Sequence, residues 1–161
     1  KAEEWAAGLV SNLARRPQGN DRAQVKGIYE GLCDVAIINN YYFGKLKYSE
    51  DPIQREWAKS MRLTFPNQEE GDRGAHINIS GGGVAKYSKN KQFAVRLLEF
   101  LSSSESQKMY SEINFEYPVN IKVSPSKELV SWGDFREDKI SIEKIAQMSV
   151  DAQKIIDRVG W

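Results

Sequence analysis

The sequence predicts an α/β fold whose sheet is incomplete. Amphipathic helical patterns alternate with short apolar runs rich in β-branched residues, which is typical of α/β domains. The clearest run, residues 33–38 (CDVAII), is almost wholly apolar, which is typical of a parallel-sheet strand buried on both of its faces. The predicted strands are few, and the connection between Pro118 and Asp138 is long. We therefore expect a sheet that this chain alone does not complete.

The first sixteen residues have the pattern of an amphipathic helix, because Trp5, Leu9 and Leu13 recur every four positions. No Ser, Thr, Asp or Asn precedes this helix to cap its first amide groups, and we expect the start of the protein to be missing. The other predicted helices cover 21–30, the charged stretch up to about 59, 90–101, a segment capped by Ser104, and about 141–159. Strands are predicted over 33–38, 61–65 and 76–80, with an extended segment at 116–119.

Composition excludes several functional classes. The 161 residues include 23 basic and 22 acidic side chains, so the net charge of +1 gives no electrostatic argument for a dedicated nucleic-acid binder. A single cysteine, Cys33, and a single histidine, His76, exclude disulfide scaffolds and metal sites built from several such residues. No apolar run approaches the roughly 20 residues of a membrane-spanning helix. We expect neither nucleic acid as a partner nor direct insertion into a membrane.

The residues after the first predicted strand are the most informative for function. In α/β sheets, ligands bind beyond the carboxyl ends of strands, beside the N-terminus of the next helix. Tyr41 and Tyr42 lie at such a junction, where two neighbouring phenols can converge on one point. A phenolate is a hard oxygen donor suited to ferric iron, and a nearby cation favours the ionised phenol. Spacing alone favours plain aromatic packing, with a metal site as the alternative.

Six short strings carry a resemblance to a known family, the periplasmic ferric-ion-binding proteins. These proteins are the solute receptors of bacterial iron ABC importers. The strings follow the family's order along the whole chain: AEEWA at 2–6, AIINNYYFG at 36–44, FPNQ at 65–68, HINISG at 76–81, NFEYPV at 114–119 and DRVGW at 157–161.

This resemblance implies a type II periplasmic-binding-protein fold whose two lobes close on Fe(III). It implies that the adjacent tyrosines, Tyr41 and Tyr42, ligate the iron. A synergistic anion such as carbonate or phosphate would be held partly by Asn39, with Asn20 as a weaker candidate beyond the direct contacts. A third tyrosine ligand would come from upstream of this chain. The implied protein is a periplasmic, non-enzymatic receptor that delivers iron to an ABC transporter permease.

The family's topology also implies how the chain is divided. Complete members are about twice as long, so we expect this chain to be a fragment covering parts of both lobes. Residues 1–70 would belong to the second lobe, 71–115 would cross back to the first, and 116–161 would return to the second with the C-terminal helix.

Other polar residues favour ordinary structural roles. His76 lies on a predicted strand, and the Gly81–Gly83 run lacks the GK[ST] ending of a phosphate-binding loop. The acidic residues near Glu69 lack calcium-loop spacing, and no nucleophile–base pair has a recognisable signature. Two alternatives to iron binding remain: a receptor for another small anion or organic solute, and, with less support, an α/β enzyme fragment.

Overall fold

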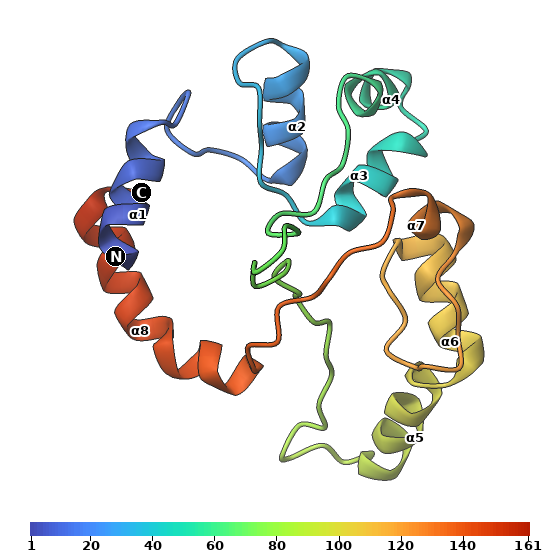
Figure 1. The fold of residues 1–161 in the computed structure, drawn as a ribbon. Coiled ribbons are helices and arrows are strands. Elements are labelled where there is room, and N and C mark those ends of the chain that lie inside the picture. Colours follow the sequence, from blue (N-terminus) through green and yellow to red (C-terminus); the bar gives the residue numbers. More distant parts are fainter.

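A computed structural model describes all residues, 1–161. The chain folds into nine helical segments joined by irregular connections. The helices are α1 (Ala2–Ser11), α2 (Asp21–Tyr29), α3 (Asn40–Lys47), α4 (Pro52–Lys59), α5 (Lys91–Leu101), α6 (Ser104–Met109), a π-helical turn (Tyr110–Asn114), α7 (Lys127–Ser131) and α8 (Ile142–Val159). In Figure 1 the helices lie around the connecting segments at the centre, with α1 beside α8, α2 to α4 clustered together, and α5 to α7 forming a third group.

The predicted helices form, with changed boundaries. The first is shorter than expected: it ends at Ser11, and the Asn12 side chain donates back to the Gly8 carbonyl over 2.8 Å. The charged stretch divides into α3 and α4, because Asp51 caps the second helix and Pro52 starts it. Ser103, rather than Ser104, caps α6. The short helix α7 and the π-helical turn were not predicted.

The predicted strands do not form ladders, and this corrects the expectation for 33–38, 61–65 and 76–80. The chain contains one isolated parallel bridge, between Ala75 and Glu137. A strand needs a neighbour to pair with. No β-bridge joins any two of the three segments, and residues 33–38 make no backbone–backbone hydrogen bond.

The small core lies among α2, α3 and α4. Val25, Leu46 and Ala58 are buried together there, and the partly buried Ile38 and Trp57 pack against them. Ile38, the last residue of the 33–38 segment, is thereby fixed to the core. This arrangement sets the direction in which the chain enters α3.

A second contact packs α3 against the π-helical turn. Phe115, which has a positive φ of 60°, stacks on Tyr48 with ring centroids 5.5 Å apart. Gly44 is required here, because a Cβ atom at that position would overlap the Phe115 ring. Farther along, Glu128 of α7 binds Lys47 at 2.6 Å and the Tyr48 hydroxyl at 2.6 Å. The C-terminal half of α3 is therefore fixed by several independent contacts.

Two connections cross near the centre of Figure 1. The Ala75 amide donates to the Arg136 carbonyl, and the Asp138 amide donates to the Ala75 carbonyl, both over 2.8 Å. Arg73 forms an ion pair with the buried Asp138 across the same crossing. The backbone amide of Ile140 is the largest cause lowering the pKa of Asp138, and Arg73 lowers it further. This crossing joins the α2–α4 cluster to the rest of the chain.

Candidate functional site: a tyrosine pair at the start of α3

The first turn of α3 is held in place from α2. Asp21 Oδ1 accepts hydrogen bonds from the Asn39 backbone amide at 2.7 Å and from Asn39 Nδ2 at 3.2 Å. Asn39 is the N-cap residue of α3, but its side chain makes no capping hydrogen bond within the helix. Asp21 therefore takes the Asn39 amide as a partner and fixes the point at which α3 begins.

Tyr41 and Tyr42 lie side by side immediately after this anchor. Their ring centroids are 4.4 Å apart with an angle of 32° between the planes, and both side chains are half-buried. The pKa of Tyr41 is raised to about 12. The largest cause is hydrogen bonding with the Tyr42 side chain, and the second is burial. Both phenol groups thus share one partly solvent-accessible position instead of diverging.

Charged groups from several elements surround the pair. Lys45 Nζ lies 5.0 Å from the Tyr41 ring centroid, and Arg22 Cζ lies 6.0 Å from that of Tyr42. The negative charges of Asp21 and Glu116 contribute to the raised pKa of Tyr41, because a nearby carboxylate opposes ionisation of a phenol.

The sequence did not single out these charged neighbours. Lys45 was detectable in principle, because it follows Tyr41 by four positions and residues so spaced share a helix face. Asp21, Arg22 and Glu116 come from other elements, and no local motif marks them. Ser80 Oγ and Glu116 Oε2, 2.9 Å apart, bring the 76–81 segment close to the same region.

Asn20 has a local structural contact. Its Oδ1 accepts from the Ala23 amide at 3.2 Å, so its side chain caps α2. Asn39 lies next to the tyrosine pair, whereas Asn20 lies at the exposed start of α2. The four predicted site residues thus divide into three at the start of α3 and one helix cap.

The two phenol oxygens of the tyrosine pair are candidate donors for a metal ion. No group of three or more histidine, cysteine, aspartate or glutamate side chains gathers elsewhere in a metal-binding arrangement. His76 is exposed, and Cys33 is free and half-buried. Two phenolates meet the preference of ferric iron for hard oxygen donors, and they leave further coordination positions open.

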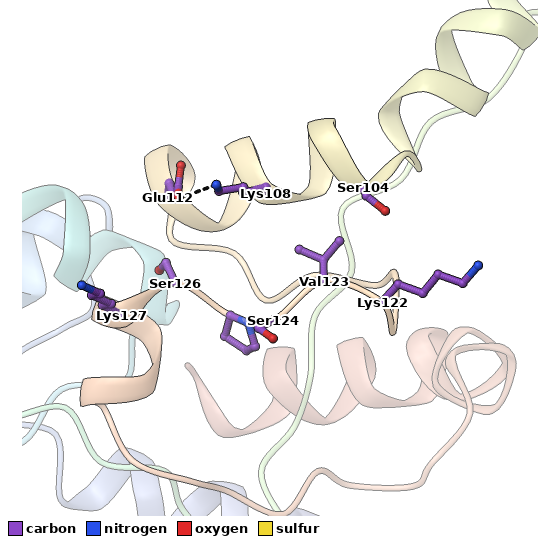
Figure 2. Close-up of a pocket in the computed structure, with 9 residues that line it drawn as sticks. Ser104, Lys108, Glu112, Lys122, Val123, Ser124, Ser126 and Lys127 are labelled. Atoms are coloured by element: carbon purple, nitrogen blue, oxygen red, sulfur yellow. Dashed lines mark ion pairs between the residues drawn. The ribbon is translucent and has the colours of Figure 1, made fainter.

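A surface pocket of about 410 Å³ lies elsewhere, among α6, the π-helical turn and α7 (Figure 2). Lys108 points toward Glu112, at 3.9 Å, while Lys122 and Lys127 extend away from each other at opposite ends. Because these ammonium groups do not converge, the pocket offers no centre for an anion. It contains none of the predicted site residues.

Relatives of known role match the chain along nearly its whole length. Iron uptake protein A1 of Synechocystis is 43% identical over 157 residues, which is 98% of this chain and 43% of that protein. The major ferric iron-binding protein of Neisseria meningitidis serogroup A is 28% identical over 159 residues, covering 99% of this chain and 45% of the relative. No family model matches the sequence.

Solved structures agree in fold. Ferric iron-Binding Protein A of Mannheimia haemolytica, in an open conformation, superposes with a TM-score of 0.89 at 45% identity, over 98% of this chain and 48% of that one. The Trichodesmium protein IdiA (FutA), in complex with iron and citrate, gives a TM-score of 0.90 at 44% identity, over 99% of this chain and 50% of that one.

The chain spans about half the length of the relatives it matches. The α/β assignment is confirmed through these neighbours, although the predicted strands are unpaired here. None of the helices has the length and apolar composition needed to cross a membrane. The resemblance found in six short strings is therefore confirmed: along its whole length the chain is homologous to part of the iron uptake and ferric iron-binding proteins, and it has their type II periplasmic-binding-protein fold over that part.

Proposed function

We propose that this chain binds ferric iron through Tyr41 and Tyr42 and serves in its delivery to an ABC importer. The observation that carries the proposal is the tyrosine pair itself, with ring centroids 4.4 Å apart at the start of α3. The iron-related names of the relatives, and the iron and citrate in the Trichodesmium complex, support the same cargo. The protein would act in the periplasm as a receptor without enzymatic activity.

Binding requires both phenols to lose their protons. The pKa of Tyr41, raised to about 12, keeps the metal-free phenol neutral at pH 7. A trivalent ion at the two oxygens reverses this preference, because a close cation stabilises the phenolate strongly. Iron uptake therefore releases protons, and affinity falls as the pH is lowered.

A small anion would complete the charge balance. Two phenolates leave Fe(III) with one uncompensated positive charge, and Lys45 and Arg22 add further positive charge nearby. Carbonate, phosphate or a carboxylate would offset these charges and fill an open coordination position. Asn39, next to the pair, would help to hold the anion, while Asn20 would act only from a distance through its cap of α2.

Iron would be released when the two lobes separate. We assign residues 1–70 to the second lobe, 71–115 to the segment that crosses to the first, and 116–161 to the return. The Ala75–Glu137 bridge lies where two of these connections meet. If ligands come from both lobes, opening at this crossing pulls them apart and weakens iron binding, and a permease would accept the ion.

Titration with Fe(III) tests the proposal. The loaded chain is expected to show a visible phenolate-to-iron absorption band. Tyr41→Phe and Tyr42→Phe should each weaken the band, and the double variant should abolish it. Tyr87→Phe is the matched control, because Tyr87 is 86% exposed and distant in sequence from the pair. Unchanged colour and affinity in the double variant would contradict the ligand assignment, and saturable binding of another solute without iron would favour the alternative cargo.

A further inference from the structure

Glu116 is a half-buried carboxylate near the tyrosine pair. No lysine, arginine or terminal amine forms an ion pair with it. Its negative charge contributes to the raised pKa of Tyr41, so it lies close enough to act on charge at the phenols. It takes no part in the contact between Asp21 and Asn39 or in the core. The anchoring and packing of α3 therefore leave its charge unused.

Two uncharged side chains hold this carboxylate. The Ser80 hydroxyl donates to Glu116 Oε2 over 2.9 Å, and Asn114 Nδ2 donates to Oε1 over 3.4 Å. Because both partners are neutral, they orient the carboxylate and leave its charge uncompensated. Ser80 belongs to the 76–81 segment and Asn114 ends the π-helical turn, so two segments far apart in the sequence fix this one side chain.

The backbone before Glu116 brings it to the tyrosine-bearing side of α3. Phe115 is in the left-handed conformation, and its ring packs on Gly44 and Tyr48. Tyr41 precedes Gly44 by three positions and Tyr48 by seven, so all three share one helix face. A π-helical turn and a non-glycine residue with positive φ both occur preferentially at functional sites. Glu116 follows directly after both features.

The charges around the pair show what this carboxylate offsets. Fe(III) bound by two phenolates keeps one positive charge, and Lys45 and Arg22 place two more near the rings. Asp21 and Glu116 together offset two of these three charges, which leaves one for a small anion. Asp21 already accepts two hydrogen bonds from Asn39 and anchors α3. Glu116 is therefore the negative group that can act on the bound ion without also anchoring the helix.

We propose that Glu116 is a specificity-determining residue of the iron site, whose carboxylate offsets the charge of the bound ion and so determines how much added anion the site requires. It acts through its charge and needs no bond to the ion. This inference rests on the proposed function, because the ion must lie at the two phenols. Without the carboxylate, the loaded site gains a second uncompensated positive charge, and an anion from solution must replace what was lost.

Titration with Fe(III), delivered as its nitrilotriacetate complex with and without added bicarbonate, measures this contribution. Glu116→Gln removes the charge and keeps a side chain of the same shape. Without bicarbonate, this variant should bind iron about 20-fold more weakly than the wild type, because its attraction to the cation is lost. Bicarbonate should bring the variant to within about 3-fold of the wild type, and should improve the wild type by less than about 3-fold.

Three further variants separate charge from structure. Glu116→Asp keeps the charge and should lose less than about 5-fold in affinity. Ser80→Ala removes one hydrogen bond, keeps the carboxylate and should also lose less than about 5-fold. Glu112→Gln removes the same charge from an exposed position in the π-helical turn, and should leave affinity unchanged. Circular dichroism of the metal-free variants checks their folding.

The possible failures can be told apart. Equal affinities and equal bicarbonate effects in the wild type and Glu116→Gln, with the phenolate-to-iron band intact, would overturn the role of Glu116 and leave the iron proposal standing. A loss that bicarbonate does not reduce, or an equal loss in Glu112→Gln, would overturn it as well. A wild-type chain without saturable Fe(III) binding, or with bound iron and no phenolate band, would overturn the proposed function and the role of Glu116 with it.

Discussion

Asp21 accepts a hydrogen bond from the Asn39 backbone amide over 2.7 Å, and this contact fixes the residue at which the tyrosine-bearing helix begins. A second bond from Asn39 Nδ2 to the same oxygen, at 3.2 Å, holds the asparagine side chain beside the pair. The position of Tyr41 and Tyr42 thus depends on a carboxylate from a neighbouring helix.

Asp21→Ala should loosen the start of α3. Loss of the two hydrogen bonds should lower the free energy of unfolding by about 1–2 kcal/mol, because the Asn39 amide loses its acceptor. Asp21→Asn keeps an acceptor oxygen and should cost less. Chemical denaturation checks both, with the exposed Asp34→Ala as control. If Asp21→Ala and Asp34→Ala are equally stable, Asp21 does not anchor α3.

Glu128 should make stability depend on acidic pH. Burial opposes its ionisation, but hydrogen bonds from Lys47, Tyr48 and Trp132 outweigh burial and hold the pKa below its ordinary value of 4.5. The resulting stability is present above the unfolded pKa and is lost as the pH falls through the lower folded pKa.

Denaturation at a series of pH values measures this effect. Glu128→Gln should lower stability at pH 7 by about 1–3 kcal/mol, since the charge-assisted bonds are lost, and should flatten the acidic limb of the profile. Glu99→Gln is the control, because the Glu99 carboxylate is exposed and forms no ion pair. Parallel profiles for wild type and Glu128→Gln would show that another group causes the acid sensitivity.

Gly44→Ala should destabilise the chain, because the new Cβ overlaps the Phe115 ring. Overpacking of this kind costs about 1–3 kcal/mol. Gly8 is the matched control, since nothing lies within 4 Å of a Cβ there and the residue is inside α1. Gly8→Ala should therefore be neutral or stabilising by about 0.5–1 kcal/mol. Thermal unfolding distinguishes the two, and equal melting temperatures would contradict the close approach of α3 to Phe115.

The sequence allowed most helices to be predicted, because their signals are local. Helix α8 has an apolar periodicity and a serine cap, and Ser141 accepts from the Lys144 amide in the structure. Asp51 and Pro52 also mark the division between α3 and α4 locally, because an aspartate cap followed by proline begins a helix. The first predicted helix is too long, because its periodicity continues to Leu13 after the hydrogen-bonded helix has ended.

Strand pairing and the charges around the site could not be predicted in the same way. The composition of 33–38 indicates a strand but does not state whether a neighbour is present, and the structure provides none. The convergence of Tyr41 and Tyr42 follows from adjacency at a helix start. Arg22 and Glu116 approach the pair only because α2 and the segment after the π-helical turn pack near α3.

Resonance Raman spectroscopy of the Fe(III)-loaded chain, excited within the visible absorption band, tests the role of the tyrosine pair most directly. If both phenolates bind iron, tyrosine ring modes are enhanced in the wild type, weaker in each single phenylalanine variant, and absent from the Tyr41→Phe, Tyr42→Phe double variant. Enhanced tyrosine modes that persist in the double variant, or bound iron with no tyrosine modes in the wild type, would contradict the proposed iron site.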